Sequence, residues 1–305
     1  MFKLVLLALA DTTVGVQAVR LAGSLAARCG AGFAVQHVSG PLSQEGGCVL
    51  HLPGEDELTA RRAEVETLCR VAMPPGLTAD VMLSAGFVHV EVLKTARLLG
   101  PDLLVLGGLD EAERCRRELS GSARSAALLI AASAPCPVLV APAGVALPSG
   151  PFQRILAVTD LGDATEAVLG LAAQLAACEG ASLRAFHALP RQFADSANLA
   201  QALGKAKNRL DYLGRSLPGP VQLPAPLDVA VREGDPAVEI LKDARESKAD
   251  LLVLALDSYG QDGLELGRVP AHVLEGARCP VLLLGAQALA RLSASATAAA
   301  TAARG

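Results

Sequence analysis

The 305-residue sequence predicts two tandem doubly wound α/β domains, each built on a five-stranded parallel sheet. Short apolar runs alternate with segments of helical spacing along the chain, the pattern of a parallel sheet covered on both faces. In addition, residues 84–108 align without a gap with residues 232–256, and both copies contain an Asp-Leu-Leu-Val-Leu run. The length leaves about 140 residues for each copy, which is within the usual range of a domain.

In the first half, short uncharged apolar runs are expected to be buried strands, and apolar residues every three or four positions indicate helices. Gly30 and Gly32 end the first helix, and Pro74 and Pro75 end a charged second helix whose exposed face carries pairs of opposite charge. The expected order is strand 4–9, helix 14–29, strand 33–38, helix 57–72, strand 79–83, helix 88–99, strand 102–106, helix 122–133 and strand 137–140.

The second half repeats this order, and right-handed crossovers would then place its helices on both faces of a parallel sheet. The expected elements are strand 155–158, helix 164–178, strand 183–187, helix 197–216, strand 227–231, helix 237–247, strand 251–256, helix 269–275 and strand 281–284.

Composition marks the domain boundaries. Residues 142–151 contain three prolines and two glycines without any period, which predicts a linker. We therefore expect domain 1 over 1–143, a Pro/Gly linker over 144–151, domain 2 over 152–285 and a low-complexity Ala-rich tail over 286–305. The tail composition is compatible with a frayed helix or with disorder, and no role is assigned to it.

The bulk properties argue against several functions. The net charge of −4 provides no basic field for nucleic acid or for an anionic membrane surface. No apolar stretch reaches the roughly 18 residues of a membrane helix. The opening run 1–11 looks like a short signal peptide, but residues 152–160 repeat its pattern inside the chain, so we expect a strand there. A soluble cytoplasmic protein that binds neither nucleic acid nor membrane is expected.

No catalytic or metal constellation is found in the sequence. The seven cysteines contain no C-x-x-C pair and are expected to be free thiols in a reducing compartment. His37 and His187 occupy matching positions without nearby metal ligands, which favours structural histidines. No Ser/His/Asp or Cys/His order is typical of a hydrolase, so no catalytic residue is assigned, and a slow ATPase is the most that we expect by way of enzymatic activity.

Several landmarks occur in the same order in both halves. They are Asp11 and Asp160 after the first strands, His37-Val38 and His187-Ala188 at the second strands, and Cys136-Pro-Val-Leu-Val140 and Cys279-Pro-Val-Leu-Leu283 at the ends. With the repeated blocks, the chain resembles the tandem two-domain form of the universal stress protein family. The resemblance implies an adenine nucleotide alpha hydrolase-like fold and a regulatory or protective role under stress. It also implies terminal strands that pair between domains, as a pseudo-dimer within one chain, and allows a homodimer.

The ATP-binding branch of that family carries the motif G-x2-G-x9-G-[ST] after the fourth strand, where backbone amides approach the phosphates. The first half keeps Gly108 and Gly121-Ser122 but has Glu111 at the second glycine, and spacing from Cys136 favours Ser125 as an alternative hydroxyl. Asp110, Glu111 and Glu113 would repel a triphosphate. ATP or another adenine nucleotide is therefore a candidate cofactor of domain 1. The resemblance implies these binding residues: Asp11, Val38, Gly107, Gly108, Gly121, Ser122 and Ser125.

The second half departs further from the motif. Ala255 replaces an upstream glycine, and Arg268 replaces the hydroxyl residue after Gly267. The repeat offset also falls from 148 at Asp102/Asp250 to 143 at Cys136/Cys279. We therefore expect domain 2 to have lost the phosphate cradle. The alternative for the whole chain is a nucleotide-free interaction scaffold that binds a protein partner or an apolar metabolite.

Overall fold

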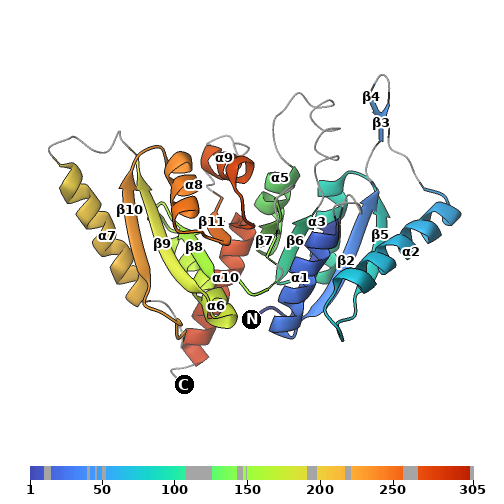
Figure 1. Cartoon of the computed structure of the whole chain (residues 1–305), viewed down its shortest axis with the longest axis horizontal. Coiled ribbons are helices and arrows are strands. Elements are labelled where there is room, and N and C mark those ends of the chain that lie inside the picture. The colour runs from blue at the N-terminus through green and yellow to red at the C-terminus, as the bar shows by residue number, and fades with distance from the viewer. Residues whose placement is uncertain are drawn as a thin grey trace. The chain divides into compact units, whose positions relative to one another are not determined.

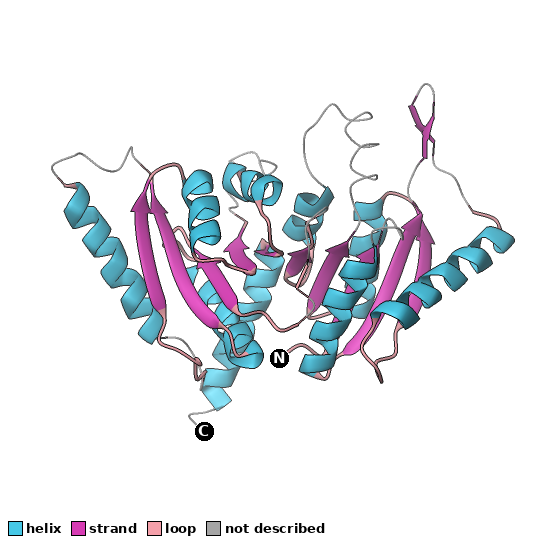
Figure 2. Cartoon of the chain, in the orientation of Figure 1, coloured by secondary structure: helices cyan, strands magenta, loops and turns pink. Residues whose placement is uncertain are grey.

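The computed structural model of the protein describes residues 1–9, 15–39, 42–44, 47–49, 53–107, 126–142, 147–148, 150–190, 198–216, 221–256 and 267–302. The chain divides into two compact units, Met1–Gly150 (unit 1) and Pro151–Gly305 (unit 2) (Figure 1). Each unit is an α/β domain with its own five-stranded parallel sheet, flanked by helices (Figure 2), and the predicted fold class is confirmed.

In unit 1 the strand order is β7-β6-β1-β2-β5, and each of these neighbouring pairs is parallel. The predicted bounds of the first strand and the third helix agree to the residue, and the others shift by a few positions. The elements are β1 (Leu4–Leu9), α1 (Gly15–Cys29), β2 (Gly32–Ser39), α2 (Glu55–Ala72), β5 (Asp80–Ala85), α3 (Val88–Leu99), β6 (Leu103–Gly107), α5 (Ala126–Ser133) and β7 (Val138–Val140).

A short antiparallel hairpin of β3 (Leu42–Gln44) and β4 (Gly47–Val49) was not predicted. Its three-residue strands are too short to produce a readable apolar alternation. The helix expected over 122–133 begins at Ala126 in the part of the chain that the structure describes. On α2, Arg61 pairs with Glu64 at 2.7 Å and Arg62 with Glu66 at 3.9 Å, as expected for a charged exposed face.

Unit 2 has the equivalent order β10-β9-β8-β11-β12, again with parallel neighbours. Its elements are β8 (Arg154–Val158), α6 (Thr165–Glu179), β9 (Ser182–Leu189), α7 (Leu199–Arg215), β10 (Asp228–Glu233), α8 (Pro236–Glu246), β11 (Leu251–Ala255), α9 (Arg268–Gly276), β12 (Val281–Leu284) and α10 (Ala286–Ala302). The described part of the tail left open in the sequence is therefore helical, and α10 contacts α6.

The order of the strands creates a switch point in each unit. The chain moves outward in one direction from β8 through β9 to β10, and then crosses to the other side of β8 to form β11. Helices α8 and α9 pack against each other, whereas α6 packs with α10. In open sheets of this kind the crevice at the carboxyl ends of the strands, where the order reverses, is the usual place for a ligand.

Apolar side chains of the central strands form the core. All residues of β6 and nearly all of β1 and β8 are buried, which explains their uninterrupted apolar sequences. Within the described residues, no helix is long and apolar enough to cross a membrane.

Two pairs of residues that the repeat preserves have structural roles. Gly86 and Gly234 adopt φ values of +151° and +157°, and a Cβ at Gly234 would lie 2.7 Å from Cγ of Glu239. Asp102 accepts hydrogen bonds from the backbone amides of residues 3 and 4, and Asp250 does the same for residues 153 and 154. Asp102 thus joins the start of β6 to the start of β1, and Asp250 joins the start of β11 to the start of β8.

Candidate functional site

A cavity of about 520 Å³ lies at the carboxyl ends of β8, β9 and β11 in unit 2, where the strand order reverses. Its volume is within the range of small-molecule sites. The starts of α6, α8 and α9 complete its wall. The residues that line it are Val158, Thr159, Asp160, Ala164, Thr165, Val168, His187, Ala188, Leu189, Pro190, Pro236, Ile240, Leu254, Ala255, Val269 and Pro270.

Three of the polar lining residues bind one another. The hydroxyl oxygens of Thr159 and Thr165 are 2.5 Å apart, and Nδ1 of His187 is 2.8 Å from the carbonyl oxygen of Thr159. Because a carbonyl oxygen only accepts, Nδ1 carries the proton, and Nε2 of the neutral ring is an acceptor. All three residues are buried. Their contacts link β8 to β9 and α6 and give the cavity a fixed polar wall. This agrees with the expectation of a structural histidine at 187.

Asp160 lies at the exposed end of this wall and shapes the turn into α6. Its Oδ1 accepts a hydrogen bond of 2.8 Å from the amide of Gly162. Leu161, between them, has a φ of +65°, and its amide donates to Oγ1 of Thr159 at 2.9 Å. The first residue before the helix is Ala164, so Asp160 stabilises the turn and is not the N-cap.

The helix starts around the cavity are poor phosphate sites. Pro236 is the first residue of α8, and Pro270 lies in the first turn of α9, so both positions lack an amide donor. Asp235 caps α8 by accepting from the amide of Val238 at 3.1 Å and brings a negative charge to that end. Gly267 precedes α9, and the exposed Arg268 is not among the lining residues. The loss of the phosphate cradle in domain 2 stays a prediction, because residues 257–266 lie outside the described residues.

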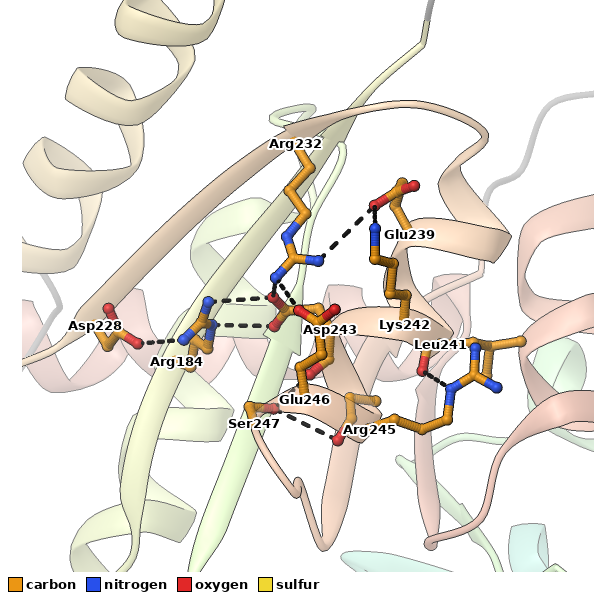
Figure 3. A network of polar contacts seen from close by, with 11 residues as sticks. Arg184, Asp228, Arg232, Glu239, Leu241, Lys242, Asp243, Arg245, Glu246 and Ser247 are labelled. Atoms are coloured by element: carbon orange, nitrogen blue, oxygen red, sulfur yellow. Dashed lines mark hydrogen bonds and ion pairs between the residues drawn. The ribbon is translucent and has the colours of Figure 1, made fainter.

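An ionic network attaches α8, which forms one wall, to the sheet (Figure 3). Asp243 of α8 is fully buried, with Arg184 of β9 at 3.0 Å and Arg232 of β10 at 2.9 Å. Arg184 also pairs with Asp228, and Arg232 with Glu246 at 2.6 Å. Burial raises the pKa of the Asp243 carboxyl, although both arginines favour its charged form. The network fixes the helix that carries Pro236 and Ile240 of the cavity.

Two of the nucleotide candidates of domain 1 can be placed. Val38 is buried near the end of β2, and Gly107 ends β6 opposite Leu9 of β1. A Cβ at Gly107 would overlap the Cβ of Ala18 on α1, so close packing of helix and strand already requires glycine there. The remaining candidates lie outside the described residues: Asp11, Gly108, Gly121, Ser122 and Ser125.

The repeat relates these candidates to the cavity of unit 2. Asp11 corresponds to Asp160, Val38 to Ala188 and Gly107 to Ala255, and the three counterparts all line the cavity. Sequence reasoning missed the cavity itself because it concentrated on the glycine motif. The available signal was the second copy, since Asp11, Val38 and Gly107 each have a counterpart in unit 2.

The chain belongs to the universal stress protein family, whose model matches residues 1–142 and 151–285. Comparison with curated proteins returned no match. The fold resembles a universal stress protein from Archaeoglobus fulgidus, at 16% identity and a TM-score of 0.64 over 92% of this chain and 96% of that chain. A functionally unknown protein from Pseudomonas aeruginosa is similar over 97% of each chain, at 16% identity and a TM-score of 0.62.

A universal stress protein solved in complex with cAMP is 26% identical over 45% of this chain and 98% of that chain, with a TM-score of 0.34.

Proposed function

We propose that this chain is a cytoplasmic regulatory or protective protein of the stress response that binds an adenine nucleotide in unit 1. The supporting observation is the correspondence between the two copies. Asp160, Ala188 and Ala255 line a cavity at the switch point of unit 2, and their partners in unit 1 are Asp11, Val38 and Gly107. The strand order of unit 1 also reverses at β1, and the carboxyl ends of the strands at such a switch point are the usual place for a ligand.

The two copies differ in the residues suited to phosphate. Unit 1 has Gly107-Gly108 and Gly121-Ser122, whereas the corresponding part of unit 2 has Ala255 and Gly267-Arg268. Glycines allow backbone amides to approach phosphate oxygens, and a following Ser adds a hydroxyl donor at the start of a helix. Adenine nucleotide binding is therefore assigned to unit 1 alone, with Ser125 as the alternative hydroxyl. No catalytic role is proposed.

Titration of the full chain with N-methylanthraniloyl-ATP tests this assignment. We expect saturable fluorescence with one nucleotide per chain and displacement by unlabelled ATP. Replacing Gly121 with Val should abolish binding, because the added side chain blocks the approach of the phosphates, while Gly267→Val should leave binding intact. Absence of saturation at millimolar nucleotide would refute nucleotide binding, and equal loss in both variants would refute its assignment to unit 1.

We also propose that the two units act as a pseudo-dimer within one chain, with a homodimer as a further level of assembly. The support is the pair of short apolar terminal strands, Val138–Val140 and Val281–Leu284, whose edges are suited to pairing. Light scattering tests the homodimer: twice the mass of one chain supports it, and the mass of one chain contradicts it.

A further inference from the structure

We propose that the cavity of unit 2 binds an uncharged, mainly apolar small molecule that carries a hydrogen-bond donor. This ligand is distinct from the nucleotide assigned to unit 1, and the proposal does not depend on that nucleotide. It follows from the chemistry of the lining residues: their apolar character, the charge that they carry and the hydrogen bonds that they already make.

The lining is mainly aliphatic. Of the sixteen described residues that line the cavity, twelve are Val, Leu, Ile, Ala or Pro, so most of the described surface that a bound molecule would contact is hydrocarbon. Transfer of apolar surface from water into such a cavity is favourable. A ligand rich in polar groups would lose hydrogen bonds to water without replacing them, which weakens its binding. The cavity therefore selects an apolar molecule.

The charge of the lining excludes an anion. No described residue that lines the cavity is Lys or Arg, and Asp160 contributes a carboxylate. At two of the helix starts that face the cavity, Pro236 and Pro270 have no backbone N–H to donate. Asp235 adds a second carboxylate at the start of α8. A phosphate or sulfonate would meet repulsion at these positions without compensating donors.

Among the described lining residues, most of the polar groups that remain for a ligand are acceptors. Oδ1 of Asp160 accepts from the amide of Gly162, but a carboxylate has two oxygens and can accept several further hydrogen bonds. One hydrogen bond joins the hydroxyls of Thr159 and Thr165, so one of the two keeps an O–H to donate. His187 donates through Nδ1 to the carbonyl oxygen of Thr159, which leaves an acceptor at Nε2. A donor such as an N–H or O–H group on the ligand therefore matches the wall, with Asp160 as its partner.

Two fluorescent probes with one skeleton test the proposal. N-phenyl-1-naphthylamine is uncharged and carries one N–H, whereas 8-anilinonaphthalene-1-sulfonate has the same rings and amine with an added sulfonate. We expect the uncharged probe to bind the full chain saturably at one site in unit 2, at least tenfold more tightly than the sulfonate. Equal or tighter binding of the sulfonate, or no saturation of the uncharged probe, would overturn the proposal.

Variants locate the binding to this cavity. Ala255→Leu fills the cavity and should weaken the uncharged probe at least tenfold, whereas Ala200→Leu, at an exposed position on α7, should leave it unchanged. Circular dichroism reports whether each variant is folded. If Ala255→Leu does not fold, Ala164→Leu fills the cavity from the start of α6 instead. Unchanged binding in a folded cavity-filling variant would place the probe elsewhere and refute the site.

The role of the carboxylate has its own test. Asp160→Asn keeps an oxygen for the amide of Gly162 but removes the negative charge. We expect the sulfonate probe to bind this variant at least threefold more tightly than the wild type. The ratio between the affinities of the uncharged probe and the sulfonate probe should therefore decrease. An unchanged preference would show that Asp160 does not select against anions. Because Ala255→Leu should not alter N-methylanthraniloyl-ATP binding in unit 1, failure here is distinguishable from failure of the nucleotide assignment.

Discussion

Arg184 of β9 binds Asp243 of α8 through two contacts, with Nε 3.0 Å from Oδ2 and Nη2 3.1 Å from Oδ1 (Figure 3). The carboxylate is fully buried, whereas the arginine side chain is 30% exposed. The repeat places Ala34 and Thr95 at the matching positions of unit 1, so this ion pair is specific to unit 2. A buried pair of this kind contributes little net stability as long as both partners are present, but loss of one partner leaves a buried charge.

Arg184→Ala is therefore expected to destabilise the protein by about 2 kcal/mol, less than for a fully isolated buried charge because Arg232 still pairs with Asp243. Urea unfolding followed by circular dichroism measures this loss. The matched control is Arg245→Ala, since Arg245 is exposed and, among the described residues, its Nε donates to the carbonyl of Leu241 in the same helix. That control should change stability by less than about 0.5 kcal/mol. Similar values for the two variants would contradict the role of the buried pair.

The pH dependence of the free energy of unfolding should reveal the contribution of the Glu246 carboxylate. The hydrogen bond from Arg232 lowers the pKa of the Glu246 carboxyl below its ordinary value of 4.5. A lowered folded-state pKa means that this carboxylate contributes stability above about pH 4.5, and that the contribution is lost as the pH falls through the folded value. Burial raises the pKa of Asp243, so that group acts in the opposite direction.

Glu246→Gln should thus reduce the loss of stability between about pH 5 and pH 3, measured as the urea midpoint at each pH. The exposed Glu275 on α9 lies outside the network, and Glu275→Gln should follow the wild-type curve. Identical pH profiles for wild type and Glu246→Gln would show that the ion pair with Arg232 does not persist in solution.

The sequence was sufficient for the parallel strands of both units because they are uninterrupted apolar runs, such as Leu103–Gly107 and Leu251–Ala255. It left the tail undecided, since Ala, Ser and Thr give no amphipathic period, and only contact with α6 shows that α10 belongs to unit 2. Helix boundaries moved by one or two residues where no strong cap was present, as at Ala164.

The site was less accessible from the sequence. Val158, Ile240 and Leu254 look like ordinary core residues, and only the strand order brings them to one edge around a cavity. Arg184 and Asp243 are 59 positions apart and lie within a strand and a helix whose periods do not reveal that they meet. Pairing of side chains across elements depends on tertiary packing, which a single sequence does not report.

Thiol reactivity should distinguish two buried cysteines from an exposed one. Burial raises the pKa of Cys69 to about 11 and that of Cys279 to about 12, with nearby carboxylates adding to the effect. Because the thiolate is the reactive form, both should resist iodoacetamide at pH 8 in the folded protein, whereas the exposed Cys178 should react. Peptide mass spectrometry measures each site, and all three should react in urea. Early modification of Cys279 in the folded protein would contradict the packing around β12.

Replacing glycines with alanine should lower stability at the repeated positions Gly234 and Gly86 but raise it at a control position within a helix. Gly234 has a φ of +157°, and an added Cβ would lie 2.7 Å from Cγ of Glu239, so Gly234→Ala should cost roughly 1–3 kcal/mol. Gly86→Ala should cost somewhat less, because its Cβ would be 3.0 Å from Cγ of Glu91.

The control is Gly170, which lies within α6 and whose added Cβ would meet nothing within 4 Å. Alanine is the better helix former, so Gly170→Ala should stabilise the protein by about 0.5–1 kcal/mol. Urea unfolding of the three variants measures the change in the free energy of unfolding for each. If Gly234→Ala were neutral, the loop before α8 would have to adopt another backbone conformation, and the position of Pro236 and Ile240 in the cavity wall would need to be revised. Retained probe binding alongside a large loss of stability would instead show that this glycine serves the fold and not the ligand.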